Sequence, residues 1–146
     1  MSVGKICQRE VDFADPEESV FLAAERMRDH TVGALVVLNE RRQPIGILTD
    51  RDVTLRVVAG GRDPHSTTVE DVMTREPKTA AEQTPIEVAV AQMRAGAFRR
   101  LPVVDEGGEL VGLVTLDDIL MLLCEEFNSI GGLLARETPA AAATGA

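Results

Sequence analysis

Two segments of the chain place their apolar residues at a helical spacing. These residues recur at i, i+3, i+4 and i+7, which puts them on one face of a helix. They are Val20, Ala23, Ala24 and Met27 in the first segment, and Ile86, Ala89, Val90 and Met93 in the second. Residues 15–18 and 84–87 carry start signals, an N-cap residue followed by proline. The two prolines are not at equivalent positions, so we expect the two helices to start slightly differently.

A hairpin and a second helix are expected after each of these helices. Two short runs rich in Val, Leu and Ile, joined by a polar turn, are typical of antiparallel strands. The runs lie at residues 34–38 and 45–48, and again at 101–104 and 110–114. The second helices are expected at residues 51–59 and 116–127, and residues 133–137 can add a last helical turn beyond two glycines.

The two sets of elements are copies of one unit. Residues 3–53 recur without gaps as residues 69–119, and one offset aligns Gly46 with Gly112 and Leu35 with Leu101. The unit is β-α-β-β-α, and an α+β fold class follows. A single copy buries little surface, so we expect the two copies to pack as one pseudo-two-fold module. The first unit with its linker covers residues 1–66, the second covers 67–130, and a partly disordered tail covers 131–146.

Charge and composition narrow the range of partners. The chain has 146 residues, a formal net charge of −9 and only 3% aromatic residues. An acidic surface repels phosphate backbones and anionic lipids, so nucleic acid and membrane partners are not expected. The apolar runs are far shorter than a membrane-spanning helix requires. The first residues lack the apolar region of a secretory signal, and we expect a cytoplasmic location.

No residue pattern indicates catalysis or metal binding. Cys7 and Cys124 form no paired motif, and we expect two buried thiols, with a redox or metal role as the alternative. His30 and His65 have no second ligand at metal spacing, and we expect them on the surface or in loops. The usual nucleotide-hydrolysing, dinucleotide-binding and nucleophile motifs are absent from the sequence. We therefore expect no enzymatic activity and no required cofactor.

The most constrained motif reads G-x-x-T-x-x-D, where the second strand of each hairpin meets the second helix. It begins at Gly46 in the first copy and at Gly112 in the second. Threonine followed three residues later by aspartate is close to a capping box, which is a purely structural role. The same arrangement also suits a ribose phosphate, because a helix N-terminus attracts phosphate and a carboxylate accepts hydrogen bonds from a diol.

With these motifs the chain resembles the cystathionine β-synthase (CBS) domain family, specifically a tandem CBS pair, or Bateman module. The resemblance is carried by G-I-L-T-D-R-D-V at residues 46–53, G-L-V-T-L-D-D-I at 112–119, R-R-L-P-V-V-D at 99–105 and V-E-D-V-M-T at 69–74. It implies a regulatory module that binds an adenine nucleotide or adenosyl ligand, of the AMP, ADP or ATP class, in clefts between the copies. It also implies a homodimer and an effector protein acting in trans.

The resemblance also implies roles for particular residues. Asp52 and Asp118 would accept the ribose diol, and Thr49 and Thr115 would lie near the phosphate. Basic residues before the first hairpin strand would meet the phosphate, with Arg51 as a further candidate or else a solvated ion-pair partner. These positions hold Arg99 and Arg100 in the second copy but Gly33 and Ala34 in the first. The adenine would lie against Val32, Ala80, Phe98 and Pro102, unless these are plain core residues.

The mismatch between the copies predicts unequal clefts, of which the second binds phosphate better. An alternative function remains open at this point. The clefts can be empty or vestigial, and the module can then serve only dimerisation, through apolar helix faces that include Ile119, Leu120, Leu122 and Leu123. These residues equally suit the intramolecular core.

Overall fold

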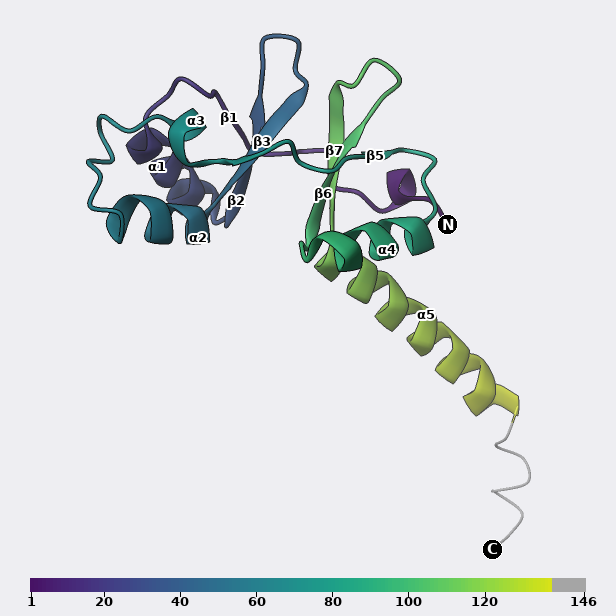
Figure 1. Cartoon of the computed structure of the whole chain (residues 1–146). Coiled ribbons are helices and arrows are strands. Elements are labelled where there is room, and N and C mark those ends of the chain that lie inside the picture. The colour runs from purple at the N-terminus through teal and green to yellow at the C-terminus, as the bar shows by residue number, and fades with distance from the viewer. Residues whose placement is uncertain (138–146) are drawn as a thin grey trace, which may run out of the picture.

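The computed structural model describes residues 1–137 as two halves that lie side by side, each with one sheet and its helices (Figure 1). The first sheet has the strand order β1-β2-β3-β4 and the second β5-β6-β7. The first half contains β1 (Phe13–Ala14), α1 (Val20–His30), β2 (Ala34–Leu38), β3 (Pro44–Thr49), α2 (Asp50–Asp52), η2 (Val53–Val58), α3 (Val69–Val72) and β4 (Thr74–Arg75). The second contains η1 (Val3–Lys5), β5 (Ala80–Ala81), α4 (Ile86–Gly96), β6 (Arg100–Val104), β7 (Leu110–Thr115) and α5 (Leu116–Glu137).

The strand pairing repeats with the sequence. β2 and β3 are antiparallel with Ala34 opposite Thr49, and β6 and β7 are antiparallel with Arg100 opposite Thr115. A parallel strand precedes each hairpin, since β1 pairs with β2 and β5 pairs with β6. The predicted α+β fold with two β-α-β-β-α units is confirmed.

The opening segments of the two copies are exchanged between the halves. Val3 is fully buried in the core of the second half, together with Ala89 and Leu101. Val69 and Val72 are buried in the core of the first half. Accordingly, the N-terminus lies beside α4 and β5, while α3 lies beside α1 (Figure 1). The packed cores therefore do not follow the repeat boundaries, because each half completes its core with the start of the other copy.

A third apolar cluster joins the two halves. Val36 and Leu38 of β2 are buried together with Leu110 of β7, and Val11 and Leu113 pack against them. Two of these five residues lie in one sheet and two in the other, so the hairpins contact each other through side chains. This contact sets the geometry of the groove between the halves.

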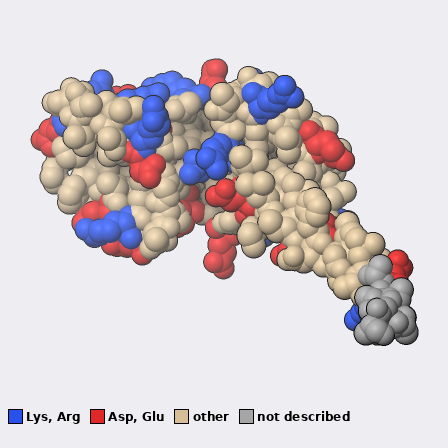
Figure 2. Space-filling view, turned by 90° about the horizontal axis from the view of Figure 1, so that it is seen from below, with Lys and Arg blue, Asp and Glu red and all other residues tan. Residues whose placement is uncertain are grey.

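The second helices differ from each other and from the prediction. In the first half α2 has three residues and passes into a π-helical turn, η2, which the sequence pattern did not reveal. In the second half α5 continues through Gly131 and Gly132 to Glu137, so the expected break at these glycines is wrong. α5 projects from the body, and its visible face carries few charged side chains (Figures 1 and 2). The predicted disordered tail lies largely beyond residue 137, outside the described residues.

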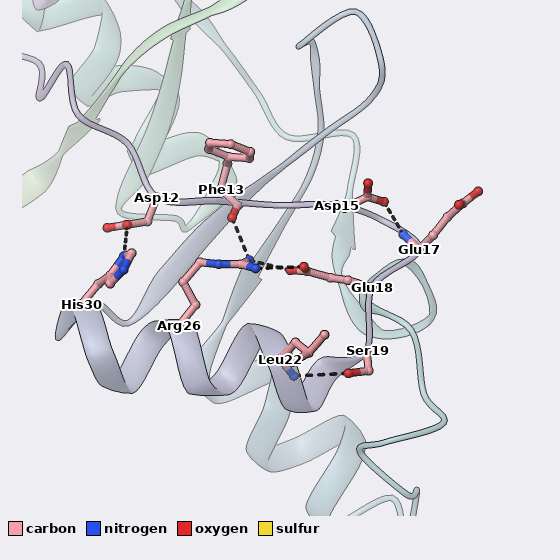
Figure 3. Close-up of polar contacts among 9 residues, drawn as sticks. All are labelled: Asp12, Phe13, Asp15, Glu17, Glu18, Ser19, Leu22, Arg26 and His30. Atoms are coloured by element: carbon pink, nitrogen blue, oxygen red, sulfur yellow. Dashed lines mark hydrogen bonds and ion pairs between the residues drawn. The ribbon is translucent and has the colours of Figure 1, made fainter.

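The first helices start at equivalent positions, contrary to the expectation of different starts. Ser19 caps α1 by accepting a hydrogen bond from the Leu22 amide at 3.3 Å (Figure 3). Its counterpart in the second copy, Pro85, is the N-cap residue of α4 and has no side-chain bond. Asp15 does not cap the helix, because its carboxylate accepts from the Glu17 amide at 2.8 Å within the preceding turn.

Candidate functional site

Both copies of the threonine–aspartate motif form a capping box. Asp52 accepts a hydrogen bond from the Thr49 amide at 3.0 Å, and its own amide donates to the Thr49 hydroxyl at 3.1 Å. In the second copy the Thr115 amide and hydroxyl both donate to Asp118 Oδ2, at 2.8 and 2.9 Å. The structural role predicted for the motif is therefore present in both copies, and any ligand must use what the capping box leaves available.

The second carboxylate oxygen of the motif aspartate, Oδ1 of Asp52 or Asp118, has different surroundings in the two copies. Asp52 is only 9% exposed, and its Oδ1 lies 3.9 Å from the Arg56 guanidinium. Arg56 also donates to the carbonyls of Val72 and Met73, at 2.8 and 3.1 Å. Asp52 thus belongs to a structural network that holds α3 in place. Asp118 Oδ1 instead accepts one hydrogen bond, at 3.0 Å, from the exposed side chain of Gln8.

Asp118 faces a cavity of about 330 Å³ between the two halves. The first copy contributes its opening segment and the residues between α1 and β2, and the second contributes the motif and neighbouring strand residues. The lining residues are Gln8, Glu10, Val11, Asp12, Thr31, Val32, Gly33, Ala34, Arg100, Leu113, Thr115, Asp117 and Asp118. We call this cavity the Asp118 cleft.

A second cavity of about 320 Å³ adjoins the cleft at the start of α5. It is lined by Arg99, Arg100, Thr115, Leu116 and Asp117. Of these residues, Arg100, Thr115 and Asp117 also line the Asp118 cleft. Arg99 lies 3.5 Å from the Asp117 carboxylate, an exposed ion pair. Two guanidinium groups and one carboxylate therefore line this second cavity.

Carboxylates of the first copy also line the Asp118 cleft. Asp12 lines it, and its carboxylate contacts the imidazole of His30 at the end of α1 (Figure 3). The neighbouring Phe13 carbonyl accepts from Arg26 at 3.0 Å, and Arg26 forms an ion pair with Glu18. The hydrogen bond to the Glu18 carboxylate raises the pKa of the Arg26 guanidinium. The segment that carries Asp12 is thereby fastened to α1.

The structure brings together part of the predicted site. Thr115, Asp118, Arg99, Arg100, Val32 and Gly33 surround the two adjoining cavities. Thr49, Asp52 and the exposed Arg51 line neither of them. Ala80 and Pro102 are buried in the second half, and Phe98 packs against its core. For Ala80 and Phe98 the core alternative describes the observed position.

One premise of the sequence analysis needs correction. Gly33 and Ala34 were assigned to one cleft and the two arginines to another, yet Gly33, Ala34 and Arg100 line the same cavity. The reason is that each wall of the cleft comes from a different copy. Seven further lining residues were not predicted, because the sequence pattern gives them no ligand role and the packing of the halves brings them to the site. They are Gln8, Glu10, Val11, Asp12, Thr31, Leu113 and Asp117.

The two cysteines and the histidines do not form a metal site. Within residues 1–137, no group of three or more metal-ligating side chains is placed to hold an ion. Cys124 is exposed and Cys7 half-buried, so the prediction of two buried thiols is wrong. Burial raises the pKa of the Cys7 thiol above its usual value. His30 and His65 are exposed, as expected.

The sequence model of the CBS domain matches residues 3–59 and again residues 69–125. The chain belongs to the CBS domain family. It is a tandem CBS pair, and such pairs are regulatory modules. Among helices within residues 1–137, none is long and apolar enough to cross a bilayer.

Several known proteins resemble this CBS pair in sequence or in structure. An uncharacterised protein of Methanopyrus kandleri, MK0525, is 38% identical over 84% of this chain, which spans 62% of that protein. The CBS domain-containing protein YhcV of Bacillus subtilis is 38% identical, over 81% of this chain and 82% of its own length. The crystal structure of the CBS domain pair of protein MJ0100 with 5′-methylthioadenosine and S-adenosyl-L-methionine is 28% identical. The superposition covers 86% of this chain and 98% of the MJ0100 chain, with a TM-score of 0.78.

Proposed function

We propose that this CBS pair binds an adenine nucleotide or related adenosyl ligand in the Asp118 cleft and signals the bound state to an effector protein in trans. The observation that carries the proposal is the position of Asp118. Its carboxylate stands at the start of a long helix, in a cavity lined by both copies, and only an exposed glutamine side chain occupies its second oxygen. The adenosyl ligands named for the MJ0100 pair support the same ligand class.

In the proposed complex the ribose diol donates to Asp118 Oδ1 and displaces the amide of Gln8. The 5′ group extends toward Arg100 and the adjoining cavity. The base lies against the apolar side chains of Val11, Val32 and Leu113. Each contact uses a residue that lines one of the two cavities.

Signalling follows from the composition of the cleft. One wall belongs to the first copy and the other to the second, so a ligand that contacts both favours one relative arrangement of the halves. A partner that binds this arrangement better responds to the ligand, and the coupling free energy for such linked sites is typically about 1–3 kcal/mol. The chain itself needs neither catalytic residues nor a resident cofactor for this role.

A homodimer is part of the proposal, and exposed apolar residues support it. Leu120, Leu123 and Phe127 of α5 are 48%, 48% and 73% exposed. Ile119 is only 3% exposed and belongs to the core of the second half, which is the other position that the sequence left open for this face. The same exposed surface favours the alternative function, a dimerisation module with vestigial clefts. A cytoplasmic location stays a prediction.

Calorimetric titration with adenosine, AMP, ADP, ATP, 5′-methylthioadenosine and S-adenosyl-L-methionine tests the proposal. Asp118→Ala should weaken binding of the best ligand at least about tenfold. Asp52→Ala is the matched control, because it removes the same capping box without touching the cleft. It should keep the affinity and lower stability by about 1 kcal/mol. If none of the compounds binds at millimolar concentration, or if Asp118→Ala binds unchanged, the proposal is wrong and sedimentation tests the dimerisation alternative.

A further inference from the structure

We infer that the Asp118 cleft selects adenosyl ligands by the charge of the 5′ group. Neutral or positively charged groups, such as a thioether or a sulfonium, bind best, a monophosphate binds less well and a triphosphate worst. This inference rests on the proposed function and narrows its ligand class.

The walls of the cleft carry more carboxylates than guanidinium groups. Four carboxylates line the cavity, from Glu10, Asp12, Asp117 and Asp118, against a single guanidinium, from Arg100. Arg99 adds a second cation in the adjoining cavity, but it lies 3.5 Å from Asp117 and offsets that carboxylate. His30 offsets Asp12 only when its imidazole is protonated. The walls therefore carry excess negative charge, within a chain whose net charge is −9.

Two of the first three amides of α5 already donate hydrogen bonds within the protein. The Leu116 amide donates to the Arg99 carbonyl at 2.9 Å. The Asp118 amide donates to the Thr115 hydroxyl, which in turn donates to Asp118 Oδ2. A phosphate site at a helix N-terminus depends on such N–H and O–H groups pointing at the ligand. Here the Asp117 amide and Arg100 are left as the main phosphate contacts, which suits at most one phosphate.

The size of the effect follows from unit charges near a solvent-exposed surface. Each additional negative charge within several ångströms of the carboxylates costs a fraction of a kcal/mol to a few kcal/mol, depending on the local dielectric. We expect 5′-methylthioadenosine to bind at least about tenfold more tightly than ATP at low ionic strength. Because salt screens exposed charges, the ratio of the two affinities should shrink as salt is raised.

Titration of the full chain with ATP, AMP, 5′-methylthioadenosine and S-adenosyl-L-methionine at low and high salt tests the inference. Glu10→Gln and Asp117→Asn each remove one carboxylate, and Asp117→Asn also releases Arg99. Both should raise the affinity for ATP relative to that for 5′-methylthioadenosine, about threefold or more. Glu40→Gln is the matched control, since it changes net charge equally in an exposed turn outside the cleft and should leave the ratio unchanged.

The outcomes separate this inference from the proposed function. ATP binding as tightly as 5′-methylthioadenosine would overturn the charge selection and leave the adenosyl site intact. The charge selection would also be overturned if the ratio of the two affinities changed neither with salt nor in Glu10→Gln and Asp117→Asn. If none of these ligands binds at millimolar concentration, the proposed function fails, and the inference fails with it.

Discussion

Replacing Val3 by alanine should destabilise the whole protein, although Val3 is the third residue of the chain. Chain termini usually tolerate such changes. Val3, however, is 0% exposed, packs in the core of the second half, and donates its amide to the Thr84 carbonyl at 2.9 Å. Removing two buried methyl groups costs about 1.6 kcal/mol in transfer free energy at about 0.8 kcal/mol each. The cavity left behind brings the total to about 2–3 kcal/mol.

Guanidinium unfolding followed by circular dichroism measures this loss. Val58→Ala is the matched control, because Val58 is 73% exposed, and its effect should stay within about 0.5 kcal/mol. Val69→Ala makes the reciprocal change in the core of the first half and should cost as much as Val3→Ala. A loss below about 0.5 kcal/mol for Val3→Ala would refute the exchanged cores.

Three further predictions test other features. Arg56→Met leaves the Val72 and Met73 carbonyls without this donor and should cost about 1 kcal/mol in chemical unfolding, whereas full stability would argue against the network. Gly131→Ala should raise stability by about 0.5–1 kcal/mol, because nothing lies within 4 Å of the added Cβ in the α5 helix; a loss of helical signal would contradict this. Burial raises the pKa of the Cys7 thiol, so alkylation counted by mass spectrometry should modify the exposed Cys124 first. Cys7 should react only as the pH rises above the ordinary pKa of a thiol, and equal rates of alkylation near pH 8 would contradict the burial of Cys7.

The repeat made the elements predictable but not all of their boundaries. Apolar spacing located both amphipathic helices and both hairpins, because burial on one face imposes that spacing. The start of α1 was placed too early, since Asp15 and Pro16 suit a turn as well as a helix start. The glycines at 131 and 132 suggested a break, but their intrinsic cost of about 1 kcal/mol each is a weak preference. The π-helical turn leaves no mark on periodicity over six residues.

The site was predictable only as far as one copy determines it. Thr115 and Asp118 were found because the motif is local and occurs twice. Gln8, Glu10 and Asp12 were missed because they reach the cleft through the exchange of opening segments, and a repeated sequence does not say whether a segment packs on its own copy or on the other. The same ambiguity led Gly33 and Arg100 to be assigned to different clefts.

The exchange of opening segments has a consequence for the origin of the chain. A single copy that kept this exchanged packing would need the start of a second molecule to complete its core, so it would fold as a concentration-dependent dimer. Joining two copies through the linker at residues 60–66 replaces that encounter with an intramolecular one, at an effective concentration of about a millimolar for a short linker. Two joined copies do not have to be identical. Arg56 can therefore lie beside Asp52 in a structural network, while Gln8 donates a hydrogen bond to the equivalent Asp118 in the cleft.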